Sequence, residues 1–249
     1  MKKSILTTLL LILAIISPLT SQDVQHKWQR FSGNWSISNS KISESKGRVS
    51  PWNVYELINY NTIVSLTPFK NYSSINFLMN ITERTKTPAE FMISFNLKSE
   101  SKSWYYHIYA FKLSGGFWGI NKASLIHSDR ADRSKPLSAK NNIFINEIAS
   151  ADCKIKYEKM YKYNVTFEDG NVTLYIDDEK ILSAPFPNKN HDGCIAISSR
   201  NAKIEIDKIT VKQNEQILFE DDFDEDSIYT KVIKATHEAI PKNETETKP

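Results

Sequence analysis

The chain has 249 residues, of which 40% are hydrophobic and 24% charged, with a formal net charge of +3 at pH 7. If Lys2 and Lys3 leave with a cleaved leader, the net charge falls to +1, so we expect no nucleic-acid partner, since phosphate binding needs clustered positive charge. The chain has two cysteines, too few for a disulfide-rich scaffold, and no ligand spacing typical of a zinc site.

The first 21 residues have the pattern of a secretory signal peptide. Lys2 and Lys3 precede the apolar run Leu9–Ile16, and small residues follow it as far as Ser21. We expect cleavage near Ser21 and an exported protein that is periplasmic, cell-surface or secreted. No later stretch approaches the ~18 apolar residues of a membrane-spanning helix, so no span is predicted.

Alternation of apolar and polar residues with period two, which is typical of strands, dominates the rest of the chain. The clearest runs are residues 75–81, 91–97 and 172–176. In residues 204–211 the alternation changes parity at Asp207–Lys208, which indicates a β-bulge. Many short strands separated by turns predict an all-β fold, a two-sheet antiparallel β-sandwich.

The least regular stretch is residues 121–151, for which we expect a long loop containing a short strand at 143–145. Without a repeat or a linker inside it, the sandwich is predicted to be one domain that spans residues 22–226.

The tail, residues 227–249, has a different pattern. Its first part places apolar residues at helical spacing, which predicts a short C-terminal helix, and its last part has the composition of a disordered segment. The apolar stripe, which includes Ile228, Val232 and Ile233, either packs on its own domain or docks another envelope protein.

Four stretches, in this order and spacing, resemble the concanavalin A-like lectin/glucanase superfamily. They are residues 31–42, 104–122 with a Gly-Gly turn, 163–180, and 191–211. Within the superfamily they are most similar to laminin-G-like domains and to the bacterial keto-disaccharide-hydrolase type. The resemblance implies a jelly-roll sandwich, but such folds serve lectins, hydrolases and adhesive domains, so it leaves the activity open.

The run FEDDFDED, which starts at Phe219, contains Glu220, Asp222 and Glu225 at the E-x-D-x-x-E spacing of the glucanase branch. In an extended chain Glu225 points away from the other two acids, and solvated acids lack the raised pKa of a general acid. We therefore expect an edge strand and turn, with Phe219 and Phe223 packed inward and the acids facing solvent. A calcium site here is chemically possible, but the spacing is not that of a defined calcium loop, so no metal or cofactor is predicted.

The aromatic stretch that starts at Trp104 carries the most informative pattern for binding. Its smaller residues, Ile108 and Ala110, suit the space between the sheets, which leaves the opposite face for sugars, because aromatic rings pack on sugar C–H groups. The alternative is that both faces are core. The candidate carbohydrate-binding residues are Tyr105, His107, Tyr109, Trp118 and Trp52.

Cys153 and Cys194 either form one disulfide in an oxidising compartment or remain two buried thiols. The sequence shows no recognisable set of catalytic residues. The first function hypothesis is therefore a non-catalytic carbohydrate-binding module of the cell envelope whose partner is a glycan. The alternatives are a structural subunit of an extracytoplasmic assembly, such as a filament sheath or envelope complex, and a glycoside hydrolase of the keto-disaccharide type.

Overall fold

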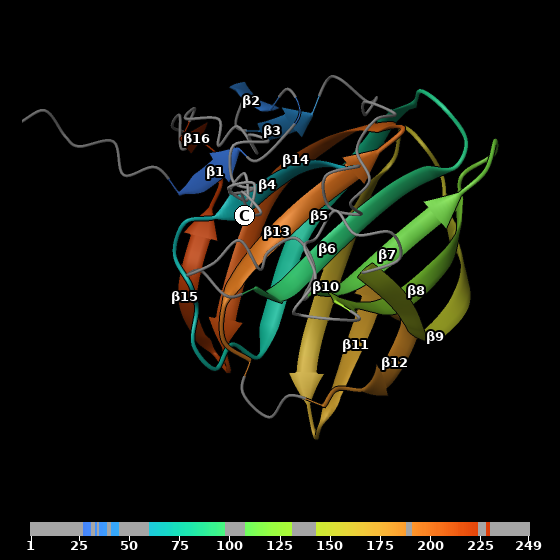
Figure 1. The fold of residues 1–249 in the computed structure, drawn as a ribbon. Coiled ribbons are helices and arrows are strands. Elements are labelled where there is room, and N and C mark those ends of the chain that lie inside the picture. The colour runs from blue at the N-terminus through green and yellow to red at the C-terminus, as the bar shows by residue number, and fades with distance from the viewer. Residues whose placement is uncertain are drawn as a thin grey trace, which may run out of the picture.

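The structure, a computed structural model, describes residues 27–30, 33, 35–38, 41–44, 60–97, 108–130, 143–187, 191–223 and 228–229. The predicted two-sheet antiparallel β-sandwich is confirmed, with two curved sheets packed face to face (Figure 1). Every regular element in these ranges is a strand, and the described part of the chain therefore has no helix long and apolar enough to cross a bilayer. The predicted leader, residues 1–21, lies outside the described residues.

Each sheet contains eight strands in the described part of the chain, and all neighbours pair antiparallel except β1 and β16. Sheet A has the order β16 (Ile228–Tyr229), β1 (Trp28–Arg30), β4 (Asn61–Ser65), β13 (Cys194–Arg200), β6 (Ala89–Leu97), β7 (Ile108–Gly115), β8 (Ile120–Arg130), β9 (Ile143–Ile155). Sheet B has the order β12 (Glu179–Pro185), β11 (Asn171–Ile176), β10 (Met160–Glu168), β5 (Ser74–Arg84), β14 (Ala202–Gln213), β3 (Lys41–Glu44), β2 (Trp35–Ser38), with β15 (Gln216–Asp221) also paired to β14.

The main hydrophobic core fills the space between the sheets with alternate side chains of the longer strands. At its centre Phe77 and Tyr163 of sheet B stack with ring centroids 5.0 Å apart, and Phe91 of sheet A packs on both. Burial of each such ring stabilises the fold by on the order of 2 kcal/mol. The alternation seen in the sequence therefore positions the two layers.

The strongest strand predictions are confirmed: residues 75–81, 91–97 and 172–176 lie in β5, β6 and β11. The predicted bulge is confirmed as well, because the pairing of β14 with β5 shifts register between Ile206 and Ile209. The shift returns Ile209 to the core-facing side, where it is fully buried.

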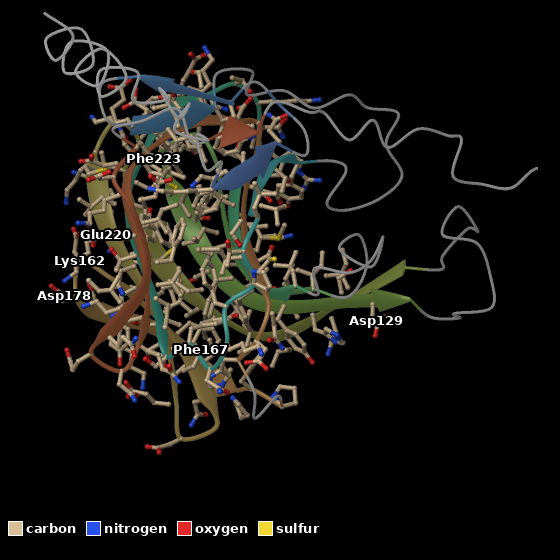
Figure 2. The ribbon with its side chains drawn as sticks, turned by 90° about the vertical axis from the view of Figure 1, so that its left-hand side faces the viewer. Asp129, Lys162, Phe167, Asp178, Glu220 and Phe223 are labelled. Carbon is tan, nitrogen blue, oxygen red and sulfur yellow. The ribbon has the colours of Figure 1, made fainter. Side chains whose placement is uncertain are left out.

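The long loop predicted for residues 121–151 is wrong at both ends: residues 121–130 belong to β8 and residues 143–151 to β9, which pair as a long antiparallel ribbon. The short strand predicted at 143–145 is confirmed as part of β9, and residues 131–142 lie outside the described residues. Figure 2 shows Asp129 on the part of this ribbon that extends away from the rest of the sandwich. Ala123 and Leu125 are buried in the main core, but Ser124 between them and Ser128 are small, polar and buried as well, which obscures the alternation in the sequence.

The predicted C-terminal helix is wrong at its start. Ile228 and Tyr229 form β16, a two-residue strand that pairs parallel with Trp28 and Gln29 of β1. The remainder of the predicted helix, including Val232 and Ile233, lies outside the described residues, so docking of an envelope protein through this stripe stays a prediction.

Glu147 on β9 is expected to titrate far below an ordinary glutamate. Hydrogen bonds from Lys122 and Ser124 to its carboxylate, at 2.9 Å and 2.8 Å, and one involving Ser150 lower its pKa from 4.5 to about 2. Because the folded pKa is depressed, the stabilisation is fully present above about pH 5 and is lost as the pH falls toward 2.

The measurement is an NMR titration of the Glu147 side-chain carboxyl, together with amide hydrogen exchange of β8 and β9 between pH 5 and 2. The stability change is expected to be small, because the side chain is 43% exposed and water screens the pair. In Glu147→Gln the acid-dependent part of the exchange should disappear. A midpoint above pH 4 in the unmodified protein would contradict the expectation.

Candidate functional site

The turn between β7 and β8 is unusually tight and depends on two glycines. A Cβ atom on Gly115 would lie 2.1 Å from the carbonyl oxygen of Gly119. Gly119 itself has a φ of +148°, and a Cβ there would lie 2.3 Å from the carbonyl oxygen of Ile155. Only glycine fits at either position, because the colliding atoms are backbone.

This turn presents two aromatic side chains to solvent, Phe117 and Trp118, which we call the aromatic tip. They are 64% and 89% exposed, the two most exposed large hydrophobic residues in the described part of the chain. Their rings meet edge to face with centroids 5.0 Å apart. The guanidinium carbon of Arg84, at the end of β5, lies 4.4 Å from the centre of the Phe117 ring, a cation–π contact.

The turn between β9 and β10 anchors the aromatic tip. The Tyr157 hydroxyl donates a 2.7 Å hydrogen bond to the carbonyl oxygen of Gly116. Burial raises the pKa of Tyr157, an effect that the nearby Arg84 partly opposes, so the hydroxyl remains a donor at neutral pH. The next residue, Glu158, donates its backbone N–H to Ile81 of β5 at 2.8 Å. The tip is therefore fixed to both sheets.

An exposed aromatic pair on an anchored turn can bind a flat, partly apolar ligand. The ring of Trp118 offers an apolar face and an indole N–H donor, and Arg84 supplies further donors beside Phe117. An exposed tryptophan ring does not contribute to the stability of the fold as a buried ring would. Such residues are enriched where proteins bind partners.

Of the five predicted site residues the structure describes Trp118 and Tyr109, and it does not bring these two together. Trp118 is exposed at the aromatic tip, whereas Tyr109 lies six residues from Gly115 along β7, about 20 Å away at the rise of a strand. Tyr105, His107 and Trp52 lie outside the described residues.

The prediction that Tyr109 faces a sugar is wrong. Its side chain is 7% exposed in the core between the sheets, stacked on His127 at 4.3 Å and edge-on to Phe186. Ile108 and Ala110 point to the other face of sheet A, where they are buried too. For Ile108, Tyr109 and Ala110, the alternative prediction that both faces of the strand are core is therefore correct. Both faces are apolar, so the alternation of residue types could not show which face lies between the sheets.

The structure describes residues 219–223 of the acidic run, and Glu225, the third acid of the E-x-D-x-x-E spacing, lies outside the described residues. Glu220 is half exposed and bonded to Lys208, at 2.9 Å. Phe219 and Phe223 pack inward as predicted, but the expectation that Asp221 faces solvent is wrong. Asp221 is 2% exposed and accepts a 2.7 Å hydrogen bond from the Trp28 indole N–H.

Sequence reasoning missed a buried carboxylate at the centre of sheet A. Glu90 on β6 is 3% exposed and accepts a 2.8 Å hydrogen bond from the Tyr60 hydroxyl. It also pairs with Arg200 of β13 and, at 3.6 Å, with Lys112 of β7. Its partners across the two neighbouring strands are Arg200 and Ser114, neither of them the second acid that glycosidase chemistry requires. The overlooked signal is that Glu90 is the one charged residue in β6.

Cys153 and Cys194 are free, buried thiols. Of the two alternatives, the disulfide is therefore wrong and the pair of buried thiols is correct. Strands β6, β7 and β8 separate β13 from β9, which places the cysteines about 19 Å apart at the usual strand spacing. A disulfide needs Cα atoms within about 7 Å. Burial raises the pKa of the Cys153 thiol to about 11. Among the described residues no group of three or more His, Cys, Asp or Glu side chains is arranged to hold a metal ion.

No protein-family model and no curated protein matches this chain. Among solved structures, the carbohydrate-binding module CBM66 from Bacillus subtilis is similar, with a TM-score of 0.50, 11% identity, and coverage of 76% of this chain and 96% of that one. The metal-free carbohydrate recognition domain of Emp46p has a TM-score of 0.52, 8% identity, and coverage of 75% and 88%. At these identities the likeness shows the fold alone, a two-sheet jelly-roll sandwich.

Proposed function

We propose that this chain is an exported, non-catalytic glycan-binding protein and that the aromatic tip is its contact surface. One observation carries the proposal: Trp118 is 89% exposed on a turn that Tyr157 and Gly119 hold in place. A rigid exposed ring binds the C–H face of a sugar without the entropic cost of ordering a loop. Export is part of the proposal because residues 1–21 have the pattern of a signal peptide.

Two further points support this function. Two solved proteins of the same fold are described as a carbohydrate-binding module and a carbohydrate recognition domain. In addition, two buried carboxylates make structural contacts: Glu90 is paired with Arg200 and Lys112, and Asp221 is bonded to Trp28. A binding module therefore fits the described residues better than a glycosidase.

The test is a glycan-array screen of the chain without its leader, followed by calorimetry on the best oligosaccharide. Trp118→Ala is expected to weaken binding at least tenfold, which corresponds to about 1.4 kcal/mol. Trp118→Tyr should retain most of the affinity because it keeps a ring. Ile217→Ala, a substitution at a 51% exposed residue on β15, is the control.

Equal affinities for Trp118→Ala and the Ile217→Ala control would show that the aromatic tip is not the binding surface. Absence of binding to every glycan on the array would remove the proposed function itself.

A further inference from the structure

A cavity of about 450 Å³ opens at the edge of the sandwich, where β9 of sheet A meets the ends of β10, β11 and β12 of sheet B. We call it the edge pocket. Its floor is apolar, formed by Cys153, Ile155, Tyr161, Ile176 and Ile181. The volume lies within the range of small-molecule binding pockets.

Charged groups of both signs surround this floor. Lys159 lies 4.2 Å above the ring of Tyr161 and 3.5 Å from the carboxylate of Asp177. Glu179, Asp152 and Lys154 add exposed groups at the mouth. Because the charges nearly cancel, the pocket favours a neutral ligand rich in hydroxyl groups over a strongly charged one.

The edge pocket and the aromatic tip share one structural unit, the turn between β9 and β10. Ile155 lines the pocket, and its carbonyl oxygen lies against Gly119, the residue after Trp118. Consecutive Cα atoms are about 3.8 Å apart, so the Trp118 backbone lies within about 8 Å of Ile155. A short oligosaccharide can span that distance.

The pocket walls are also fixed in place. The Tyr161 hydroxyl accepts a 3.0 Å hydrogen bond from the backbone N–H of Lys156, in the same turn that anchors the tip. In the same lining, the Asp177 carboxylate accepts a 2.9 Å hydrogen bond from the backbone N–H of Lys162. A pocket that exists before binding does not have to be ordered by its ligand.

From this arrangement we infer that the edge pocket is a second subsite, which takes a neutral pyranose unit of an oligosaccharide whose neighbouring units stack on Trp118. The apolar floor receives the C–H face of the sugar, while Lys159 and Asp177 bond its hydroxyl groups. This inference rests on the proposed function and narrows its ligand to neutral glycan chains rather than single sugars.

The test uses neutral oligosaccharides of glucose, mannose and galactose with two, four and six units, measured by calorimetry. Affinity is expected to rise about tenfold between two and six units. Glu179→Trp, which adds bulk at the exposed mouth without touching the core, should abolish that rise and leave disaccharide affinity unchanged. Glu168→Trp, the same change at an exposed residue at the far end of β10, is the matched control.

An independent readout follows the methyl groups of Ile155, Ile176 and Ile181 by NMR in the unmodified protein. Six-unit chains should shift all three signals, and disaccharides should not. Binding that depends on Trp118 but not on chain length or Glu179→Trp, without these shifts, would overturn the subsite alone. No binding by any member of the panel would overturn the subsite and the proposed function together.

Discussion

Asp221→Ala is expected to lower the free energy of unfolding by about 3 kcal/mol. The Asp221 carboxylate accepts hydrogen bonds from the fully buried Trp28 indole, at 2.7 Å, and from the backbone N–H of Phe223, at 3.1 Å. It also pairs with Lys27 at 3.1 Å. Removing it leaves buried donors without an acceptor, each costing about 1–3 kcal/mol.

These contacts join the two ends of the described chain, because Trp28 lies on β1 and Asp221 ends β15 (Figure 2 labels Phe223 just after that strand). The measurement is equilibrium denaturation in urea, with Asp222→Ala as the matched control. Asp222 is the exposed neighbour, and its substitution is expected to change stability by less than about 0.5 kcal/mol. Equal effects of the two substitutions would show that the Trp28–Asp221 contact does not stabilise the fold.

Glu90→Ala is expected to destabilise the protein by about 3–5 kcal/mol, the usual cost of breaking a buried ion pair by removing one partner. Without the carboxylate, the guanidinium of Arg200, whose side chain is 26% exposed, loses its counter-charge. The Tyr60 hydroxyl, fully buried, loses the acceptor it reaches at 2.8 Å.

The comparison that isolates this effect is Glu83→Ala, which removes the 55% exposed carboxylate paired with Lys203 and should cost less than about 1 kcal/mol. Both variants are measured by urea denaturation, and glycan affinity is measured on the folded fraction. Glu90→Ala should leave that affinity unchanged, since the Glu90 carboxylate bonds Tyr60, Arg200 and Lys112 rather than Phe117 or Trp118. A variant that is fully stable but no longer binds would assign Glu90 to the binding site and contradict its structural role.

Local alternation identified the strands whose two faces differ in polarity. In β5 the residues Ile75, Phe77, Met79 and Ile81 are buried and those between them are only partly so, and this contrast is visible in the sequence. The bulge in β14 was predictable for the same reason. The apolar residues change from even to odd positions at Asp207–Lys208, and an extra residue there lets both halves of the strand face the same core.

The same reasoning failed at the start of β7, where the residues on both faces are apolar and buried. In β7, Tyr109 and Phe111 face the other sheet, while Ile108 and Ala110 belong to a second cluster on the outer face of sheet A. Nothing in the order of these residues distinguishes the two faces. The aromatic stretch therefore indicated a strand but assigned Tyr109 to the wrong side.

The sequence by itself determined the all-β class, the positions of the strongest strands and the Gly-Gly turn that carries Trp118, because these depend on neighbouring residues and on backbone geometry. Tertiary structure alone decided that Trp118 is exposed while Tyr109 is buried, that Asp221 bonds Trp28 from the other end of the chain, and that Cys153 and Cys194 lie too far apart to bond. These outcomes depend on which strands become neighbours across long separations. Strand order is set by the packing of the whole core, and no local pattern encodes it.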